Sequence, residues 1–586
     1  MRSTVRLTAS ATSALPRWLL FAICVVYAAS GLFGRDPWKN EDAAAFGVMW
    51  TLANGGWHDW LLPNLVGKAI TATGPLPYWL GALGIRAFGP LLAPNDAAHL
   101  LTGLMFCGMC AFVWYGTYLL GRRPEVQPFK YAFGGEPAPR DYGRTLADGA
   151  LLILLASFGL AERGHESTPQ IGQLVCTAMY LYGLVRALDK PWQGACWTGV
   201  ALGSFSLCAS PPLSAALVIS LLAAALVVRP LDRRKLLGVA IPLGLAITLV
   251  WPLAAHLAYP EEAGPYLSDW VWTNFANFSG SPKGALFYAS KNLPLFTWPA
   301  WPLAIWTWFS WPDLRRAPHI ALPLSIVVPV LALIVLQQHE TNLLFLLLLP
   351  PLAVMASFGL PTLKREVINA FDWFAVLSFT IVGGFVWIVW IASETGFPAQ
   401  IARNLSRLVP GYKPEFNILS LLAALAVTLC WIALVRWRLA RHPKVLWRSV
   451  ILSGAGTTLM WVLLMTLWLP LVNFSRTYRD VATQIATRLP SDYTCITPVR
   501  LGDAQVASFA YFGNMHFAFD GADCDVLLRQ DAQDYNPPAS LSPYTWNLVW
   551  EGRRAADRDE RFRLYVRVER PRHATAPAHR SNASPR

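Results

Sequence analysis

Long apolar runs recur along most of the chain, and they restrict its fold more than any other feature of the sequence. Runs of this length with few charges are typical of transmembrane helices. Charged residues make up only 14% of the chain, whereas soluble proteins carry about a quarter. These features exclude a soluble enzyme, a nucleic-acid-binding module and a disordered scaffold. We therefore predict a mainly α-helical, polytopic membrane protein.

The apolar runs predict about thirteen transmembrane helices. The shorter stretch Pro75–Gly89 is interrupted by glycine and proline and has Tyr78 and Trp79 near its start, which favours a helix along the membrane interface. The first run resembles a signal peptide, but we expect it to be retained as an anchor. The predicted spans lie near 17–34, 98–121, 148–161, 170–187, 195–209, 211–228, 235–257, 295–312, 320–336, 341–358, 371–392, 416–436 and 448–471.

Basic residues in the connecting segments predict the orientation of the chain. From Arg2 and Arg6 onward, every second connection carries arginine or lysine, as cytoplasmic loops do. Arg403, Arg407 and Lys413 break this pattern, because they fall in an outer loop. We therefore take the net charge of +13 mainly as a record of orientation. We predict a multi-pass protein of the bacterial inner membrane with a cytoplasmic N-terminus and a periplasmic C-terminal domain.

Three regions outside the predicted spans are long enough to hold a site, and the last of them changes composition abruptly. There, a predicted helix over 478–488 is followed by short strand-like runs at 525–530, 546–550 and 563–568. This pattern indicates a small exported α/β domain. The final segment is rich in Pro, Ala, Ser, His and Arg and is predicted to be disordered. The predicted organisation is a transmembrane domain over 1–472 with exported loops 35–97 and 258–294, an α/β domain over 473–570 and a tail over 571–586.

Seven of the nine cysteines lie in or beside apolar spans, where a buried thiol is the default. Cys495 and Cys524 are the exceptions, because both fall in the predicted exported domain. Disulfides persist in an oxidising periplasm. We predict that these two residues form a disulfide, and the alternative is two unpaired buried thiols.

The densest polar cluster, Gly-Arg-Asp-Pro-Trp-Lys-Asn-Glu-Asp at 34–42, follows the first apolar run directly. Acids and bases concentrated at the outer membrane surface are costly unless they are solvated or used. One interpretation is a solvated loop that ends the helix. The other is a general base, or a carboxylate that activates an acceptor, at the boundary between water and lipid.

The run Gly-Arg-Asp-Pro-Trp-Lys-Asn-Glu-Asp-Ala-Ala-Ala-Phe-Gly (34–47) is followed by Ala-Asn-Gly-Gly-Trp (53–57) and Ala-Thr-Gly-Pro-Leu-Pro-Tyr-Trp (72–79). These segments resemble the first exported loop of bacterial family 39 glycosyltransferases. These GT-C fold membrane enzymes include protein O-mannosyltransferases and aminoarabinose lipid A transferases. The resemblance implies a polyprenyl-phosphate sugar donor, a lipid, glycan or protein acceptor in the envelope, and inversion at the anomeric carbon.

The departures from the family pattern fall on the implied site residues. The family places aspartate before glutamate, whereas this chain has Glu41 before Asp42. The family's donor-phosphate lysine falls on Thr73, and a second external aspartate would align near Gln170. A neutral threonine cannot replace a point charge that faces phosphate. The resemblance therefore leaves open whether activity is retained.

The resemblance implies a role for each remaining candidate. Glu41 is the predicted base and Asp42 its assistant, with the reverse assignment as a rival. Lys68 is the nearest substitute for the missing lysine, and Lys39 and Arg35 are alternatives that also fit as interfacial anchors. The predicted substrate-binding residues are Lys39, Lys68, Thr73, Tyr78, His165 and Gln170. His165 and Glu166 form a pair that would supply the second acidic function or would be merely solvated.

Two main functions remain open from the sequence. The first is a membrane glycosyltransferase that uses a lipid-linked sugar. The second is a degenerate relative that binds or scaffolds in envelope glycan assembly, which Thr73 and Gln170 favour. The sequence fits a transporter less well, because a substrate pathway usually needs ionisable residues within the membrane and the spans contain few near their centres. A divalent metal is possible, since the sequence neither names nor excludes one.

Overall fold

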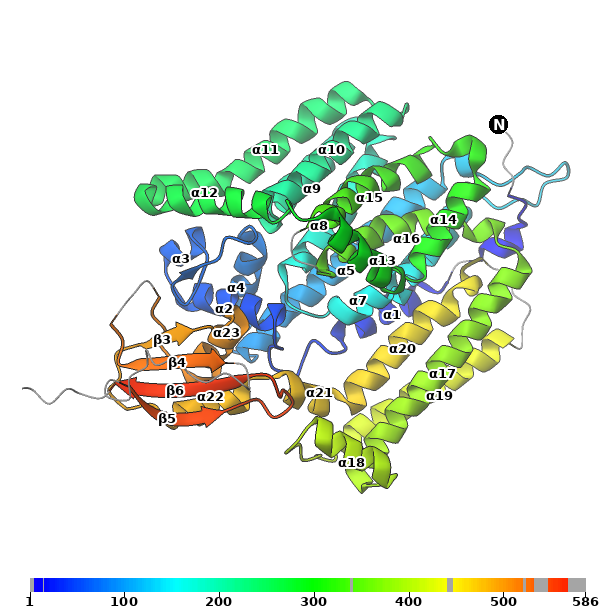
Figure 1. Ribbon diagram of the computed structural model, residues 1–586. Helices are drawn as coiled ribbons and strands as arrows, with labels where there is room; N and C mark the ends of the chain where they lie inside the picture. Colours follow the sequence, from blue (N-terminus) through cyan, green and yellow to red (C-terminus); the bar gives the residue numbers. More distant parts are fainter. Residues whose placement is uncertain are drawn as a thin grey trace, which may run out of the picture.

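The structure is a computed structural model that describes residues 5–13, 15–337, 341–439, 446–519, 523–531 and 546–567. The predicted tail 571–586 lies outside these residues. Helices form one large bundle, and a small β-sheet lies at one end of it (Figure 1). This arrangement confirms the predicted fold class, a mainly α-helical membrane protein with a small α/β unit near its C-terminus.

Within the described residues, six helices are long and apolar enough to cross a membrane, and a bent pair raises the number to seven. The pair consists of α20 (Ile451–Leu467) and α21 (Leu469–Arg476), which meet at 70° beside a proline that cannot continue the first helix. The six spans are Ala9–Ala29, which contains α1 (Arg17–Ala29), α5 (Pro94–Gly121), α11 (Arg233–Ala258), α15 (Pro318–Leu336), α17 (Arg365–Thr395) and α19 (Ile418–Leu439), the last passing over Ile418–Arg438.

Helices also occupy the other predicted spans, but each is shorter or less apolar. Helices that contact protein on most sides can carry buried polar residues, as α6 does at Thr145 and Asp148, and these lower the mean hydropathy. This explains why the sequence shows more runs than the structure has long spans. The helices are α6 (Pro139–Ala156), α8 (Pro169–Ala187), α9 (Pro191–Cys208), α10 (Pro211–Val227), α14 (Ala300–Ser310) and α16 (Leu349–Ser357).

The two predicted outer loops that precede the C-terminal region are folded. Region 35–97 forms two short strands in an antiparallel pair, and its helices pack beside them. Region 258–294 contains two further helices. The elements are α2 (Glu41–Asn54), α3 (Trp57–Leu61), β1 (Asn64–Leu65), β2 (Lys68–Ala69), α4 (Leu76–Phe88), α12 (Pro260–Ala276) and α13 (Pro282–Phe296). The short α4 coincides with the predicted interfacial helix.

The sheet domain comprises α22 (Arg479–Ala486), α23 (Asp503–Gly513) and a four-stranded sheet in the order β3-β4-β6-β5. The β3 and β4 strands are parallel, and the other pairs are antiparallel. The predicted strand-like runs are therefore confirmed. The strands are β3 (Ile496–Val499), β4 (Val526–Asp531), β5 (Trp546–Gly552) and β6 (Arg561–Arg567).

The sheet domain and the acidic-motif helix α2 share one hydrophobic core. Buried Phe46 and Met49 of α2 belong to the same cluster as Phe509, Leu528 and Phe562. A Cβ atom at Gly47 would lie 2.4 Å from the Cβ of Ala507, so only glycine lets α2 and α23 approach this closely. The sheet domain is therefore packed onto the helix that begins at the acidic motif.

Candidate functional site

Asp42 is fixed at the start of α2 by a buried ion pair. Its Oδ2 lies 2.6 Å from Arg35 Nη1, and neither side chain is exposed. Oδ2 also accepts a hydrogen bond from the Trp38 backbone N–H at 2.9 Å, and Oδ1 accepts one from the Ser167 N–H at 2.7 Å. Burial raises the pKa of Asp42, but the Arg35 charge, a smaller effect of His99 and the hydrogen bonds from Arg35 and the Trp38 N–H together lower the pKa below its usual value.

Arg35 extends this buried network to other parts of the chain. Its Nε donates to the Gly31 carbonyl at 2.7 Å, and its Nη2 donates to the His165 carbonyl at 2.8 Å. Its guanidinium lies 4.2 Å from the Trp38 ring centroid. Arg35 and Asp42 therefore hold the motif against the connection between α7 (Phe158–Arg163) and α8. Asp42 has no exposed surface with which to meet an acceptor.

Glu41 differs from Asp42 in every one of these respects. It is exposed at the first position of α2, directly after Asn40, whose φ is 73°. Among the described residues it makes no hydrogen bond or ion pair, although its charge acts on the nearby Arg163 guanidinium. An exposed carboxylate without a partner can accept a proton. Glu41 is thus the exposed acid of the pair, and its role as the base stays a prediction.

The sheet domain holds the acidic motif from the other side. Arg479 donates both Nε and Nη2 to the Asp36 carboxylate, and the Thr477 hydroxyl donates to it at 2.8 Å. Lys39 Nζ lies 3.3 Å from Asp557 Oδ2. Lys39, a predicted substrate-binding residue, is thus engaged in holding the loop to the sheet domain.

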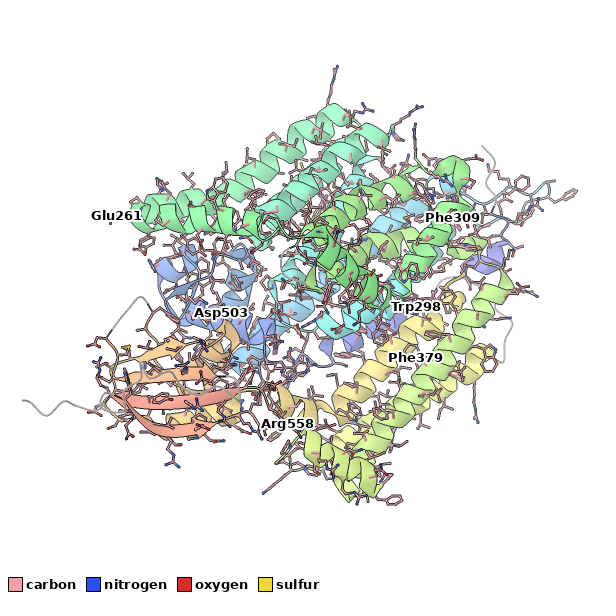
Figure 2. All side chains as sticks on the ribbon, in the orientation of Figure 1. Glu261, Trp298, Phe309, Phe379, Asp503 and Arg558 are labelled. Carbon is pink, nitrogen blue, oxygen red and sulfur yellow. A yellow bond between two sulfur atoms is a disulfide. The ribbon has the colours of Figure 1, made fainter. Side chains whose placement is uncertain are left out.

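A second cluster forms where the β1–β2 hairpin meets α23. Lys68 Nζ lies 2.5 Å from Asp503 Oδ1, and both side chains are partly exposed. The Thr73 hydroxyl lies 3.1 Å from the Tyr78 hydroxyl. Burial raises the pKa of Tyr78 to about 12, and the Asp503 charge adds to the rise. Three predicted residues are therefore brought together, with Asp503 at the boundary between the sheet domain and the helices (Figure 2).

His165 and Glu166 are neighbours in sequence but have different surroundings. His165 Nε2 lies 2.8 Å from the Tyr27 carbonyl, and its ring stacks on Trp461. Burial lowers the pKa of His165 to about 4, so the ring is neutral. His165 is thus part of a buried aromatic cluster, and this environment does not suit the predicted substrate contact.

Glu166 fits the predicted second acid better than His165 does. Its carboxylate accepts from Arg163 Nη1 at 3.1 and 3.2 Å. Burial raises the pKa of Glu166 to about 7, the Asp42 charge adds to the rise, and Arg163 opposes it. Arg163 also feels the charge of Glu41. Arg163 thus couples a carboxyl group that titrates near neutrality to the predicted base.

Gln170 lies in the first turn of α8 and is half-buried. Its Oε1 is buried without a hydrogen-bond partner among the described residues. The structure brings Gln170 to the same end of α8 as Glu166, but in the described part of the chain no hydrogen bond joins its side chain to Glu41. Within the described ranges, no three His, Cys, Asp or Glu residues form a cluster suited to a metal ion.

Several residues of this site had no signal in the sequence. Asp36 is part of the acidic motif, but its partner Arg479 lies 443 residues away. Asp503 and Asp557 likewise become relevant only through long-range contacts, whereas Arg163 pairs locally with Glu166, three residues further along the chain. Charged residues are enriched in regions outside the apolar runs, and this enrichment was the only signal in the sequence for these residues. It identified the segments that carry charge, but it did not identify which residues form ion pairs.

The arrangement of the helix bundle, the acidic loop and the sheet domain is similar to that of solved membrane glycosyltransferases of the GT-C fold. The chain matches ArnT from Cupriavidus metallidurans bound to undecaprenyl phosphate, with a TM-score of 0.65 and 16% identity over 93% of this chain and 97% of that chain. The apo ArnT structure gives a TM-score of 0.62 at the same identity and coverage.

A third match is to the archaeal oligosaccharyltransferase AglB from Archaeoglobus fulgidus, with a TM-score of 0.44 and 12% identity over 84% of this chain and 64% of that chain. No family model and no curated protein matches the sequence. At these identities the ArnT likeness establishes the fold. The chain thus has the GT-C fold that its sequence motifs predicted.

Proposed function

We propose that this protein transfers a sugar from a polyprenyl-phosphate donor to a lipid, glycan or protein acceptor at the outer face of the bacterial inner membrane. The observation that carries the proposal is an exposed, unpaired Glu41 at the acidic motif of an ArnT-like fold. The ArnT crystal structure contains undecaprenyl phosphate, which supports a donor of this class. The acceptor is proposed as a class only.

In this mechanism, the acceptor nucleophile attacks the anomeric carbon while the bond from that carbon to the phosphate oxygen breaks. The lipid phosphate leaves, the configuration inverts, and the acceptor proton passes to Glu41. Asp42 acts as a positioning residue, because its ion pair with Arg35 fixes the first turn of α2. Arg35 is buried, and Lys39 holds the loop to the sheet domain, so neither is the preferred phosphate ligand.

Lys68 is the preferred cation for the departing phosphate. It is 45% exposed at its side chain and lies in the cluster that contains Thr73. Its partner Asp503 would have to share it with the phosphate, since a cation can bridge two anionic groups at an exposed site. Arg163 is a second cation near Glu41. Preorganised cations of this kind stabilise the negative charge on a leaving phosphate.

The proposed orientation follows from the basic connections. We propose a cytoplasmic N-terminus, a transmembrane region over 1–472 and a periplasmic sheet domain over 473–570. This arrangement places Glu41, Lys68 and the sheet domain on the same side of the membrane, where the domain can hold the acidic motif.

A degenerate relative with a binding role is the second candidate function. The observation that favours it is Thr73, whose hydroxyl is engaged by Tyr78 while the nearest lysine is paired with Asp503. Such a protein would bind the lipid-linked sugar without transferring it.

Transfer by the purified protein tests the proposal. The full chain is incubated with radiolabelled polyprenyl-phosphate sugars and envelope extract, and label in the acceptor fraction is measured. We expect transfer by the unmodified protein and its loss in Glu41→Gln. Glu366→Gln is the matched control, because Glu366 is also an exposed glutamate in the first turn of a helix. Donor binding without transfer in the unmodified protein would instead support the binding role.

A further inference from the structure

The connection between α17 and α19, residues 396–417, carries the basic residues that break the orientation pattern. It contains α18 (Ala399–Leu408) and the bases Arg403, Arg407 and Lys413. Positive residues are normally retained in cytoplasmic loops. Their presence at the opposite end of two predicted spans therefore requires a different explanation.

The helix α18 is amphipathic and has no buried residue. Ile401, Leu405 and Leu408 are spaced by four and three residues, so they lie on one face. Arg403 and Arg407 are four residues apart and share the opposite face, where both are exposed. One side of the helix is thus apolar and the other is basic.

Large apolar side chains around α18 are mostly exposed. Leu408 is 71% exposed, and Phe397 and Phe416, which flank the helix, are 73% and 61% exposed. The helices α17 and α19 end here, and only 22% and 11% of their apolar windows are buried within the protein. We therefore infer that both spans face lipid, and α18 connects them at their shared end (Figure 1).

The three bases of this connection are exposed. Among the described residues, Arg403, Arg407 and Lys413 form no ion pair. Burial raises the pKa of Tyr412, and the charges of the nearby acids Glu394 and Glu415 add to the rise. A helix with an apolar face, a basic face and adjacent Phe and Leu residues is typical of peptides that bind in the plane of an anionic membrane surface.

We propose that α18 lies in the interface at the outer face of the inner membrane and binds the anionic headgroups of the surrounding lipids through Arg403 and Arg407. Ile401, Leu405 and Leu408 face the acyl boundary, and the long arginine side chains reach the phosphate level. This surface is distinct from the candidate active site, and the inference does not rest on the proposed function.

The lipid contact also supports the sheet domain. Arg558 Nη2 donates to the Arg407 carbonyl at 3.4 Å, and the Tyr412 ring lies 5.7 Å from the Phe474 ring. Figure 2 places Arg558 between the sheet domain and α18. The same β5–β6 connection contains Asp557, the partner of Lys39. A helix held by lipid thus lies directly beneath the loop that fixes the acidic motif.

Hydrogen exchange of the full chain in nanodiscs tests this proposal. One nanodisc preparation contains only phosphatidylcholine, and the other contains phosphatidylcholine with phosphatidylglycerol at three to one. We expect slower exchange of the 399–408 amides in the anionic nanodiscs. Each basic residue near an anionic surface contributes roughly fivefold in affinity, so we expect a difference on the order of tenfold. High salt should remove most of it, because exposed charges are screened.

Variants separate charge from packing. Arg403→Ala/Arg407→Ala should lose the difference between the two lipid compositions, whereas Arg403→Lys/Arg407→Lys should keep it. Arg229→Ala/Arg234→Ala is the matched control, because both residues are exposed in another connection and should leave 399–408 unchanged. Equal exchange in both nanodiscs, or an unchanged difference in the alanine variant, would overturn the proposal.

Discussion

The Arg35 guanidinium and the Asp42 carboxylate meet at 2.6 Å, and neither side chain is exposed to solvent. Glu41, the residue before Asp42, is exposed. Consecutive side chains of a helix point about 100° apart, since one turn takes 3.6 residues. The first turn of α2 therefore directs one carboxylate into the protein and the other out of it. Two adjacent acids therefore have different surroundings.

Glu41→Gln and Asp42→Asn should fail in different ways. Glu41→Gln should lower turnover by about 10²–10⁴-fold with donor binding nearly intact, because the amide cannot accept a proton. Asp42→Asn should destabilise the fold by about 3–5 kcal/mol, because it leaves Arg35 buried without its counter-charge. Turnover, donor binding and thermal unfolding are measured on each variant. A stable Asp42→Asn without activity, beside an active Glu41→Gln, would assign the base to Asp42.

Lys68→Met should weaken donor binding. A charge-assisted hydrogen bond contributes about 1.5–3 kcal/mol, so we expect the KM for the donor to rise about tenfold or more with little change in kcat. Asp503→Asn should not raise the donor KM, because it releases Lys68 from its ion pair. Lys190→Met is the control, since Lys190 is exposed and forms no ion pair within the described residues. An unchanged KM in Lys68→Met would remove Lys68 from the donor site.

Stability should depend on pH through Glu166. Burial raises the pKa of Glu166 from 4.5 to about 7, so the folded protein retains a proton that the unfolded chain releases. Stability from this group is therefore greatest below about pH 4.5 and falls as pH rises to about 7, by about 3 kcal/mol.

Thermal unfolding of the full chain between pH 5 and pH 8 measures this effect. Glu166→Gln should flatten the profile, because the amide does not titrate. Glu162→Gln should retain the slope, since Glu162 is half-exposed and adjacent to Arg163. A Glu166→Gln profile that is parallel to that of the unmodified protein would contradict the raised pKa.

The Cys495–Cys524 disulfide should be present in the mature protein. The structure bonds these two sulfur atoms, across a sequence separation of 29 residues. Closing a loop of this size contributes about 3 kcal/mol. Denatured, non-reduced protein should yield two fewer labelled thiols than reduced protein. Cys495→Ser should abolish that difference, and an equal number of labelled thiols before and after reduction would refute the bridge.

Reporter fusions should reveal the orientation of the chain. A reporter after Arg140 should indicate the cytoplasm, because Arg140 lies in a basic connection. A reporter after Thr494 should indicate the periplasm. A cytoplasmic signal at Thr494 would place the sheet domain, and with it the acidic motif, on the wrong side for the proposed transfer.

The sequence by itself determined that this is a membrane protein, and it determined where along the chain the helices lie. Apolar run length and residue spacing are local properties, and they predicted the bundle, a short helix within 75–89 and the strands near 525–530, 546–550 and 563–568. The acidic motif could also be recognised from the sequence alone, because all of its residues are contiguous.

The tertiary structure alone decided which of these residues act together. Lys68 and Asp503 are 435 residues apart, and Asp36 and Arg479 are 443 apart, so no local pattern connects them. Asp42 is buried whereas Glu41 is exposed. Burial also lowers the pKa of His165 and raises the pKa of Glu166. Desolvation and ion pairing depend on what packs around a side chain, and packing is fixed only when distant segments meet.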